Sequence, residues 1–192
     1  MKILLVGSGG REHAIAWKLA QNKNVSKIFV APGNGGTALE NKCENINITD
    51  LNELVEFAKE NNIDFTFVGP EEPLTNGITD KFKKVGLKCF GPDARAAQLE
   101  GSKTFAKEFM KKYGVKTAQY GTFTECDEAK AYLENCEYPI VIKADGLAAG
   151  KGVVIAATKE EAMKTINDFM ISDIFSGAGQ KVVIEEFLEG VE

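Results

Sequence analysis

Short apolar runs alternate with longer amphipathic stretches over the first hundred residues. Four apolar runs predict strands, at 3–6, 27–30, 65–68 and 87–90. Amphipathic stretches at 12–22 and from residue 51 onward predict helices, the second behind a capping Asp50. Strands that alternate with helices predict a doubly wound α/β domain, with a parallel sheet covered on both faces.

The pattern changes near Gly101. Ser102 is placed to cap a lysine-rich helix that ends at Tyr113, and further helices are expected from residue 125 and from 159 to about 170. Three strands are predicted, at 139–143, 153–157 and 182–187. We therefore expect an N-terminal α/β domain at 1–100, a linker helix and the start of a second domain at 101–122, and a small α+β unit at 123–192.

The first predicted strand and helix are separated by a glycine-rich turn, residues 7–10. Glycines at such a turn let the backbone approach a phosphate, and the helix N-terminus adds free amides and a positive dipole. The dinucleotide fingerprint GxGxxG fails because Glu12 takes the place of its third glycine, and Ala31 and Pro32 follow the second strand where a ribose-binding acid is expected. The turn therefore predicts a phosphate site and argues against a dinucleotide.

Arg11, one of two arginines in the chain, follows this turn, where a guanidinium can clamp a phosphate. A plain tight turn with a solvated arginine fits the loop alone equally well. Asn34 and Glu71 follow other strands at the same sheet edge, but turns collect such residues anyway. His13 and Trp17 are expected to be packing residues.

The most informative local feature is the segment 140–155, IVIKADGLAAGKGVVI. It differs from a P-loop because its spacing is one residue short, Gly152 replaces the Ser or Thr, and a strand follows. A glycine-rich loop between two strands can instead close over a nucleotide and offer amides to its phosphates. Lys143, within an apolar strand, requires an anion if it faces the interior. The alternative is a long hairpin with a solvated lysine.

Composition excludes several classes of protein. The 192 residues carry 23 Lys and Arg against 28 Asp and Glu, a net charge of -5, which disfavours nucleic acid as a partner. The single histidine excludes a multi-histidine zinc site, and four cysteines without a CxxC pair suit a reducing cytoplasm. No apolar run is long enough to span a membrane.

Six motifs together resemble the glycinamide ribonucleotide synthetase family of the ATP-grasp superfamily, over the whole chain. They are Gly9-Gly10-Arg11-Glu12-His13-Ala14, Ala31-Pro32-Gly33-Asn34, Val68-Gly69-Pro70-Glu71, Gln98 to Lys103, Ile142 to Val153, and Val183 to Leu188, in the family's order and spacing.

The resemblance implies an ADP-forming ligase of purine biosynthesis that joins the carboxylate of glycine to the amine of 5-phosphoribosylamine through a glycyl phosphate. It further implies small-molecule substrates, ATP with Mg²⁺ or Mn²⁺, a cytoplasmic location and a monomer.

The resemblance also implies roles for residues of both predicted domains. The ATP site would comprise Lys103, Lys143, Gly146, Gly150, Lys151, Gly152, Glu185, Leu188 and Glu192. Within it Lys103 and Lys143 would contact the ATP phosphates. Glu185 and Leu188 would bind adenine through their backbone, and Glu192 would hold the ribose hydroxyls. The phosphoribosylamine site would comprise Gly9, Gly10, Arg11, Asn34 and Glu71.

Family members are more than twice as long as this chain. The metal ligands, the large ATP-grasp subdomain and most catalytic residues are thus expected beyond Glu192, with no metal site in the chain and no ligase activity by itself. Other readings are a sugar-phosphate or nucleotide-binding module that does not catalyse, a carboxylase-type ATP-grasp ligase and, weakest, a dehydrogenase.

Overall fold

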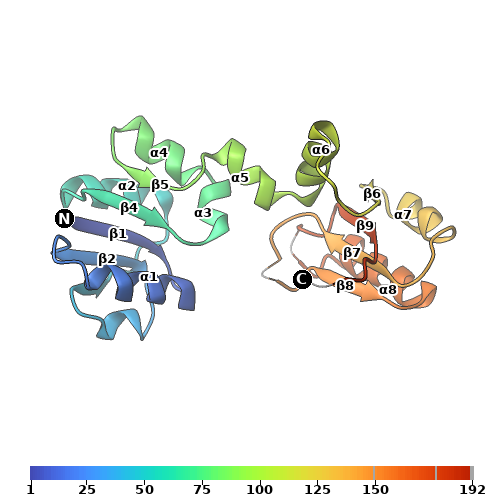
Figure 1. Ribbon diagram of the computed structural model, residues 1–192, viewed down its shortest axis with the longest axis horizontal. Helices are drawn as coiled ribbons and strands as arrows, with labels where there is room; N and C mark the ends of the chain where they lie inside the picture. Colours follow the sequence, from blue (N-terminus) through green and yellow to red (C-terminus); the bar gives the residue numbers. More distant parts are fainter. Residues whose placement is uncertain (149, 176, 191–192) are drawn as a thin grey trace. The chain divides into compact units, whose positions relative to one another are not determined.

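The computed structural model describes residues 1–148, 150–175 and 177–190, which form two compact units, residues 1–97 and 98–192 (Figure 1). Each unit has its own sheet and its own hydrophobic core.

The first unit is a five-stranded parallel sheet in the order β3-β2-β1-β4-β5. Its strands are β1 (Lys2–Gly7), β2 (Lys27–Pro32), β3 (Cys43–Asn45), β4 (Phe65–Val68) and β5 (Cys89–Phe90). Its helices are α1 (Gly10–Ala20), the short 3-10 helix η1 (Thr37–Leu39), α2 (Leu51–Glu60), α3 (Glu71–Thr75) and α4 (Ile78–Lys84). The helix α5 (Ala94–Gly101) continues the chain into the second unit.

Helices cover both faces of this sheet because alternate residues of each strand point to opposite sides. Ile3 and Leu5 of β1 pack in the cluster that contains Ala16 of α1. Leu4 and Val6 pack in a second cluster with α2 and α4. The strand is therefore apolar at consecutive positions, as expected for a parallel strand buried on both faces.

The second unit is a four-stranded antiparallel sheet in the order β6-β9-β7-β8. Its strands are β6 (Tyr120–Phe123), β7 (Ile140–Ala144), β8 (Val153–Ala156) and β9 (Val182–Glu186). Its helices are α6 (Lys103–Tyr113), α7 (Cys126–Leu133) and α8 (Lys159–Met170).

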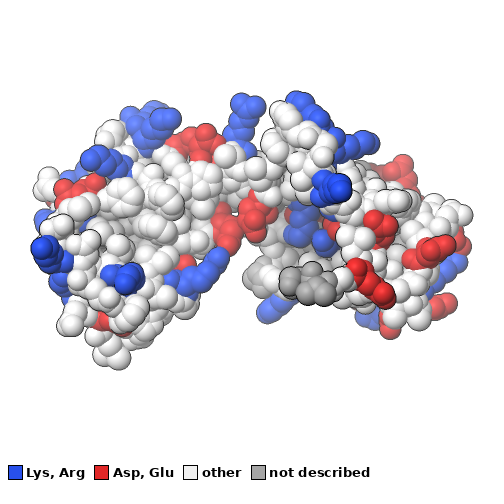
Figure 2. All heavy atoms as spheres, viewed as in Figure 1, with Lys and Arg blue, Asp and Glu red and all other residues white. Residues whose placement is uncertain are grey.

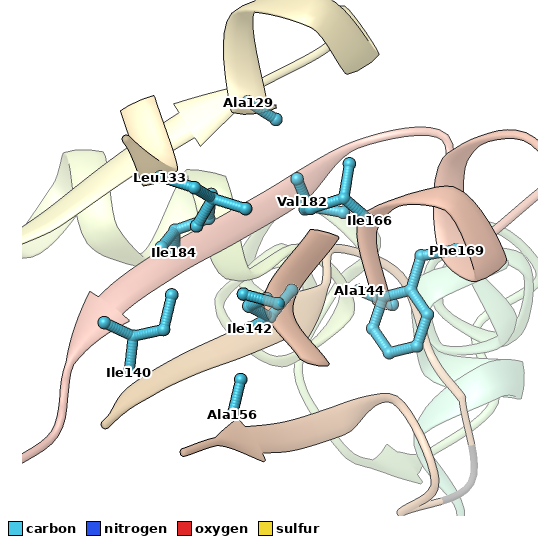
Figure 3. Close-up of a cluster of buried hydrophobic side chains, with 11 residues drawn as sticks. Ala129, Leu133, Ile140, Ile142, Ala144, Ala156, Ile166, Phe169, Val182 and Ile184 are labelled. Atoms are coloured by element: carbon cyan, nitrogen blue, oxygen red, sulfur yellow. The ribbon is translucent and has the colours of Figure 1, made fainter. Parts of the chain in front are cut away.

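One face of this second sheet carries the apolar core, in which Ile140 and Ile142 of β7 and Ile184 of β9 meet Leu133 of α7 and Ile166 of α8 (Figure 3). The residues that alternate with them, such as Lys143 and Glu185, belong to the opposite face. The two faces of the second sheet thus differ in chemistry, whereas both faces of the first are apolar.

The predicted fold class, a doubly wound parallel sheet followed by a small α+β unit, is confirmed. Ser102 and Thr158 cap α6 and α8 as predicted. The first helix begins two residues earlier than predicted because Gly9 serves as its cap, with Glu12 accepting the Gly9 N–H. The predicted strand at 87–90 is reduced to Cys89–Phe90.

On the face drawn in Figure 2, both basic and acidic side chains are scattered over the surface of each unit. Among the described residues, no helix is long and apolar enough to cross a membrane.

Candidate functional site

The first unit gathers its predicted residues at the carboxyl edge of the parallel sheet. Gly7 ends β1, α1 begins at Gly10, and Gly69 follows β4, the strand beside β1. The chain leaves β1 toward β2 on one side, whereas β4 lies on the other, so the strand order reverses here. Such a reversal leaves a crevice above the strand ends, where open α/β sheets bind ligands.

Glu12 fills the space between the two glycine turns. Its side chain is buried, and Oε2 accepts the Gly9 N–H at 2.7 Å. A Cβ on Gly69 would overlap the carboxylate, and a Cβ on Gly7 would overlap its Cγ. Glu12 therefore explains both why the dinucleotide fingerprint fails and why residues 7 and 69 are glycines.

Arg11 and Glu71 form an ion pair across the strand-order reversal, with Nη2 3.0 Å from Oε1. The side chains are 70% and 37% exposed. The pKa of Glu71 lies below its ordinary value, chiefly because its own backbone N–H donates to the carboxylate at the start of α3, and then because of Arg11. The structure thus brings together two predicted residues sixty positions apart.

Asn34 shapes the turn that follows β2. Its Nδ2 donates to the carbonyl oxygens of Ser8 at 2.9 Å and Gly9 at 3.3 Å. Its Oδ1 accepts the N–H groups of Gly36 at 2.7 Å and Thr37 at 2.9 Å. The side chain therefore joins the turn after β2 to the glycine-rich turn after β1 by hydrogen bonds.

Helix α1 carries the other two residues that the sequence singled out. His13 lies 2.9 Å from Glu40 through Nε2, in a half-buried contact. Trp17 is 53% exposed, so the expectation that it is a packing residue is wrong. The buried residues of α1 are Glu12 and Ala16, and Trp17 lies about 100° further around the helix from Ala16, outside the buried face.

The face of the second sheet that lies opposite its apolar core holds a carboxylate between two ammonium groups. Oε2 of Glu185 lies 3.0 Å from Nζ of Lys143 and 3.1 Å from Nζ of Lys107. The side chains of Glu185 and Lys107 are each 7% exposed, and that of Lys143 is 28% exposed. Lys143 thus meets the anion that its place in an apolar strand required.

Lys107 was missed by the sequence prediction, and the side chain of Glu185 was assigned no role. The signal for Lys107 is weak, because it is one of several lysines on α6 and only its position three residues after the buried Thr104 marks the inner face.

Lys103 stands at the first turn of α6, beside the glycine-rich loop. Asp145, the residue after β7, accepts the Thr104 N–H at 2.6 Å and the Ser102 hydroxyl at 3.0 Å. Nζ of Lys103 donates to the carbonyl oxygen of Gly146 at 3.2 Å. Partial burial lowers the pKa of Lys103, and the positive charge of Lys143 adds to this effect.

The glycine-rich loop is packed closely at two of its glycines. A Cβ on Gly146 would meet Ala178, and a Cβ on Gly152 would meet Ala148. Gly150 has φ +77°, a left-handed conformation that favours glycine. The conformation of this loop therefore requires glycine at these three positions. Residue 149 of the loop lies outside the described part of the chain.

Two further predicted ATP-site residues have exposed side chains. Lys151 is exposed and Leu188 is 63% exposed. The position assigned to Glu192 lies outside the described residues. Within 1–148, 150–175 and 177–190, no three His, Cys, Asp or Glu side chains gather closely enough to hold a metal ion.

Two family models match the chain. Residues 1–100 match the model described as phosphoribosylglycinamide synthetase, N domain. Residues 101–192 match the model described as phosphoribosylglycinamide synthetase, ATP-grasp (A) domain.

Curated relatives include phosphoribosylamine–glycine ligases of Clostridium acetobutylicum, 65% identical over 192 residues, and of Fusobacterium nucleatum, 56% identical over 192 residues. The matches cover 100% of this chain but 46% and 45% of those proteins. The chain therefore spans about half the length of the curated relatives it matches.

Solved structures agree with these matches. The crystal structure of a phosphoribosylamine–glycine ligase from Thermotoga maritima is 33% identical with a TM-score of 0.78, covering 100% of this chain and 45% of that one. An N5-carboxyaminoimidazole ribonucleotide synthetase from the same organism, 19% identical with a TM-score of 0.67, covers 98% of this chain and 46% of its own and shares the fold.

Proposed function

Because the chain belongs to the phosphoribosylglycinamide synthetase family, we propose that it supplies the phosphoribosylamine-binding domain and the ATP lid of an ADP-forming ligase. The ligase would join glycine to 5-phosphoribosylamine through a glycyl phosphate, in the cytoplasm and as a monomer. In this proposal, residues 1–100 bind phosphoribosylamine, 101–122 begin the ATP-grasp domain, and 123–192 are its small subdomain.

The observation that carries the proposal is the group of lysines beside the glycine-rich loop. Lys143 shares the carboxylate of Glu185 with a second lysine, and Lys103 approaches the loop from the first turn of α6. A carboxylate becomes reactive toward an amine when it accepts the γ-phosphoryl group of ATP, and that transfer needs cations around the developing charge. This face of the sheet offers such cations on rigid elements.

In the ATP site, Lys103 and Lys143 contact the phosphates while Gly146, Gly150, Lys151 and Gly152 close over them. The loop presents backbone amides and keeps water from the glycyl phosphate, which would otherwise hydrolyse. The backbone of Glu185 and Leu188 lies along the adenine edge, and Glu192 binds the ribose hydroxyls.

In the first unit, Gly9 and Gly10 offer the amides of the α1 N-terminus to the phosphate of phosphoribosylamine, and Arg11 adds a guanidinium. Asn34 holds the turn after β2 in place, and Glu71 accepts a hydroxyl of the sugar. The Arg11–Glu71 pair supports this assignment because it already places a cation and a carboxylate at the strand-order reversal.

Family membership implies the use of ATP with Mg²⁺, and in this proposal Mn²⁺ can replace it. The described residues hold no cluster of three or more His, Cys, Asp or Glu side chains suited to a metal. The metal is therefore assigned no role here, and we propose that its ligands are supplied from beyond Glu192.

The ATP assignment is tested by titrating ATP into the 192-residue chain in a calorimeter, for the unaltered protein and for Lys143→Met. We expect the variant to bind ATP at least about tenfold more weakly, since a half-buried cation assigned to the phosphates is lost. Lys164→Met is the matched control, because Lys164 is a solvent-exposed lysine of the same unit that pairs with Asp168. Equal ATP affinity in Lys143→Met and the unaltered chain would contradict the assignment.

The sugar-phosphate assignment is tested with ribose 5-phosphate, a stable stand-in for phosphoribosylamine. Arg11→Ala should weaken its binding about tenfold, whereas Arg95→Ala, the exposed second arginine, should leave it unchanged. A further expectation is that the chain alone releases no phosphate from ATP in the presence of glycine and phosphoribosylamine. Phosphate release that depends on both substrates would refute this.

A further inference from the structure

Lys107 is a buried lysine that the proposed function leaves without a role. From the middle of α6 it donates to the Thr117 hydroxyl at 2.6 Å and pairs with Glu185 at 3.1 Å. Its Nζ also lies 5.2 Å from the centre of the Tyr120 ring, a cation–π contact. Burial of an ammonium group is costly unless it is paired and hydrogen-bonded, so these three contacts together fix its position.

The strand register explains why Lys107 reaches the carboxylate that Lys143 uses. Glu185 of β9 lies opposite Val141 of β7 and opposite Tyr120 of β6. Lys143, two residues beyond Val141, therefore points to the same face as Glu185. Lys107 reaches this face from α6, so two ammonium groups meet the same oxygen, Oε2, of one carboxylate.

The three side chains carry two positive charges and one negative charge, so the cluster keeps one net positive charge. Without Lys107, Lys143 and Glu185 would form a neutral pair, and among the described residues the ammonium of Lys143 would be the remaining ion-pair partner of this buried carboxylate. An incoming phosphate would then compete with Glu185 for Lys143.

We propose that Lys107 is a positioning residue of the ATP site, which holds the carboxylate of Glu185 so that Lys143 remains available to the phosphates. The net positive charge makes this face of the sheet select a nucleoside polyphosphate over an uncharged nucleoside. The inference rests on the proposed ATP site, and it assigns Lys107 no contact with ATP itself.

The test compares variants that change the charge of the cluster by known amounts. Lys107→Met removes one positive charge, and Lys107→Met combined with Glu185→Gln restores the original net charge, with the backbone of residue 185 unchanged. Lys111→Met is the matched control, an exposed lysine one turn along α6. Affinities for ATP and for adenosine are measured by displacement of a fluorescent ADP analogue from the 192-residue chain.

We expect ATP to bind about tenfold more weakly to Lys107→Met, while adenosine and the Lys111→Met control stay within about twofold of the unaltered chain. The double variant should recover ATP affinity to within about threefold. A purely structural role for Lys107 predicts instead that the double variant binds ATP as weakly as the single variant, or that adenosine weakens in parallel. Either result overturns the inference.

The outcome for the proposed function is separate. If the unaltered chain binds ATP and Lys107→Met binds it equally well, the inference fails and the ATP site stands. If the unaltered chain binds neither ATP nor the analogue, both fail. If circular dichroism shows that Lys107→Met does not fold, the double variant decides, because it has no carboxylate at residue 185: a tenfold loss of ATP affinity in it overturns the inference.

Discussion

The two proposed phosphate sites, one in each unit of the chain, differ in how they are constructed. In the first unit, residues of the turns after β1, β2 and β4 form the proposed site, and its cation, Arg11, is 70% exposed. In the second unit, the cations Lys107 and Lys143 come from different elements and share a carboxylate that is 7% exposed. The first site therefore depends on space for the backbone, whereas the second depends on the balance of buried charge.

The largest effect that tests this contrast is expected from Gly69→Ala in the first unit. The new methyl group would overlap the buried carboxylate of Glu12, which has little room to move between the two turns. We expect the free energy of unfolding to fall by about 3 kcal/mol, the range of overpacked or strained buried sites. Urea denaturation followed by circular dichroism measures this loss.

Gly35→Ala is the control for that variant, because a Cβ at Gly35 would meet nothing within 4 Å. It should stay within about 0.5 kcal/mol of the unaltered chain. Peptide-resolved hydrogen exchange should assign the loss in Gly69→Ala to β1 and β4. A loss below about 0.5 kcal/mol in Gly69→Ala would show that backbone space does not limit the first site.

A smaller effect is expected when the helix cap of each unit is removed. Asp145→Ala should lower the free energy of unfolding by about 2 kcal/mol, because Asp145, in addition to the local cap Ser102, accepts the Thr104 N–H of α6 from 41 residues away and accepts the Ser102 hydroxyl as well. Asp50→Ala should lower it by about 1 kcal/mol, because Asp50 caps α2 locally, accepting the N–H groups of Asn52 and Glu53.

The two variants are also expected to differ in their affinity for ATP. Asp145→Ala frees the glycine-rich loop from α6 and should therefore weaken ATP binding, whereas Asp50→Ala should leave ATP binding unchanged. Calorimetric titration of both variants measures the difference. Equal ATP affinities would show that the long-range cap does not position Lys103.

The same contrast explains what the sequence could predict. The turn at 7–10, Arg11 and the caps at Ser102 and Thr158 are local, so neighbouring residues reveal them. The ion pairs of Glu185 depend on strand register and on how α6 lies over the sheet, which no short stretch of sequence encodes. Trp17 was misassigned for the same reason, since only the docking of α1 decides which side of that helix is buried.

Lys103→Met should stabilise the protein while it removes a proposed phosphate ligand. Partial burial lowers the pKa of Lys103, so its charged form is unfavourable in the folded state. We expect the free energy of unfolding of the variant at pH 7 to be higher than that of the unaltered chain by up to about 1 kcal/mol, because the Lys103 side chain is partly exposed.

The pH dependence of this gain follows from the direction of the shift. The unfavourable contribution of Lys103 is complete below its folded pKa and disappears as pH rises from there to the ordinary value of 10.5. The stability difference between Lys103→Met and the unaltered chain should therefore shrink as pH rises from the folded pKa of Lys103 toward 10.5. A difference that stays constant over this range would show that burial of the charge is not its cause.

The smallest effect is expected from Glu71→Gln, because the Arg11–Glu71 pair is largely exposed. The folded pKa of Glu71 is lowered, so its contribution is present above the ordinary value of 4.5 and is lost as pH falls through the folded value. Glu71→Gln should cost about 0.5 kcal/mol or less at pH 7 and nothing at the acid end of the range, with Glu72→Gln, its exposed neighbour, as the control. Urea denaturation at pH 7 and at a series of lower pH values measures both. A loss at pH 7 as large as that of Gly69→Ala would mean that the first unit, like the second, depends on paired charge, and the contrast between the two sites would not hold.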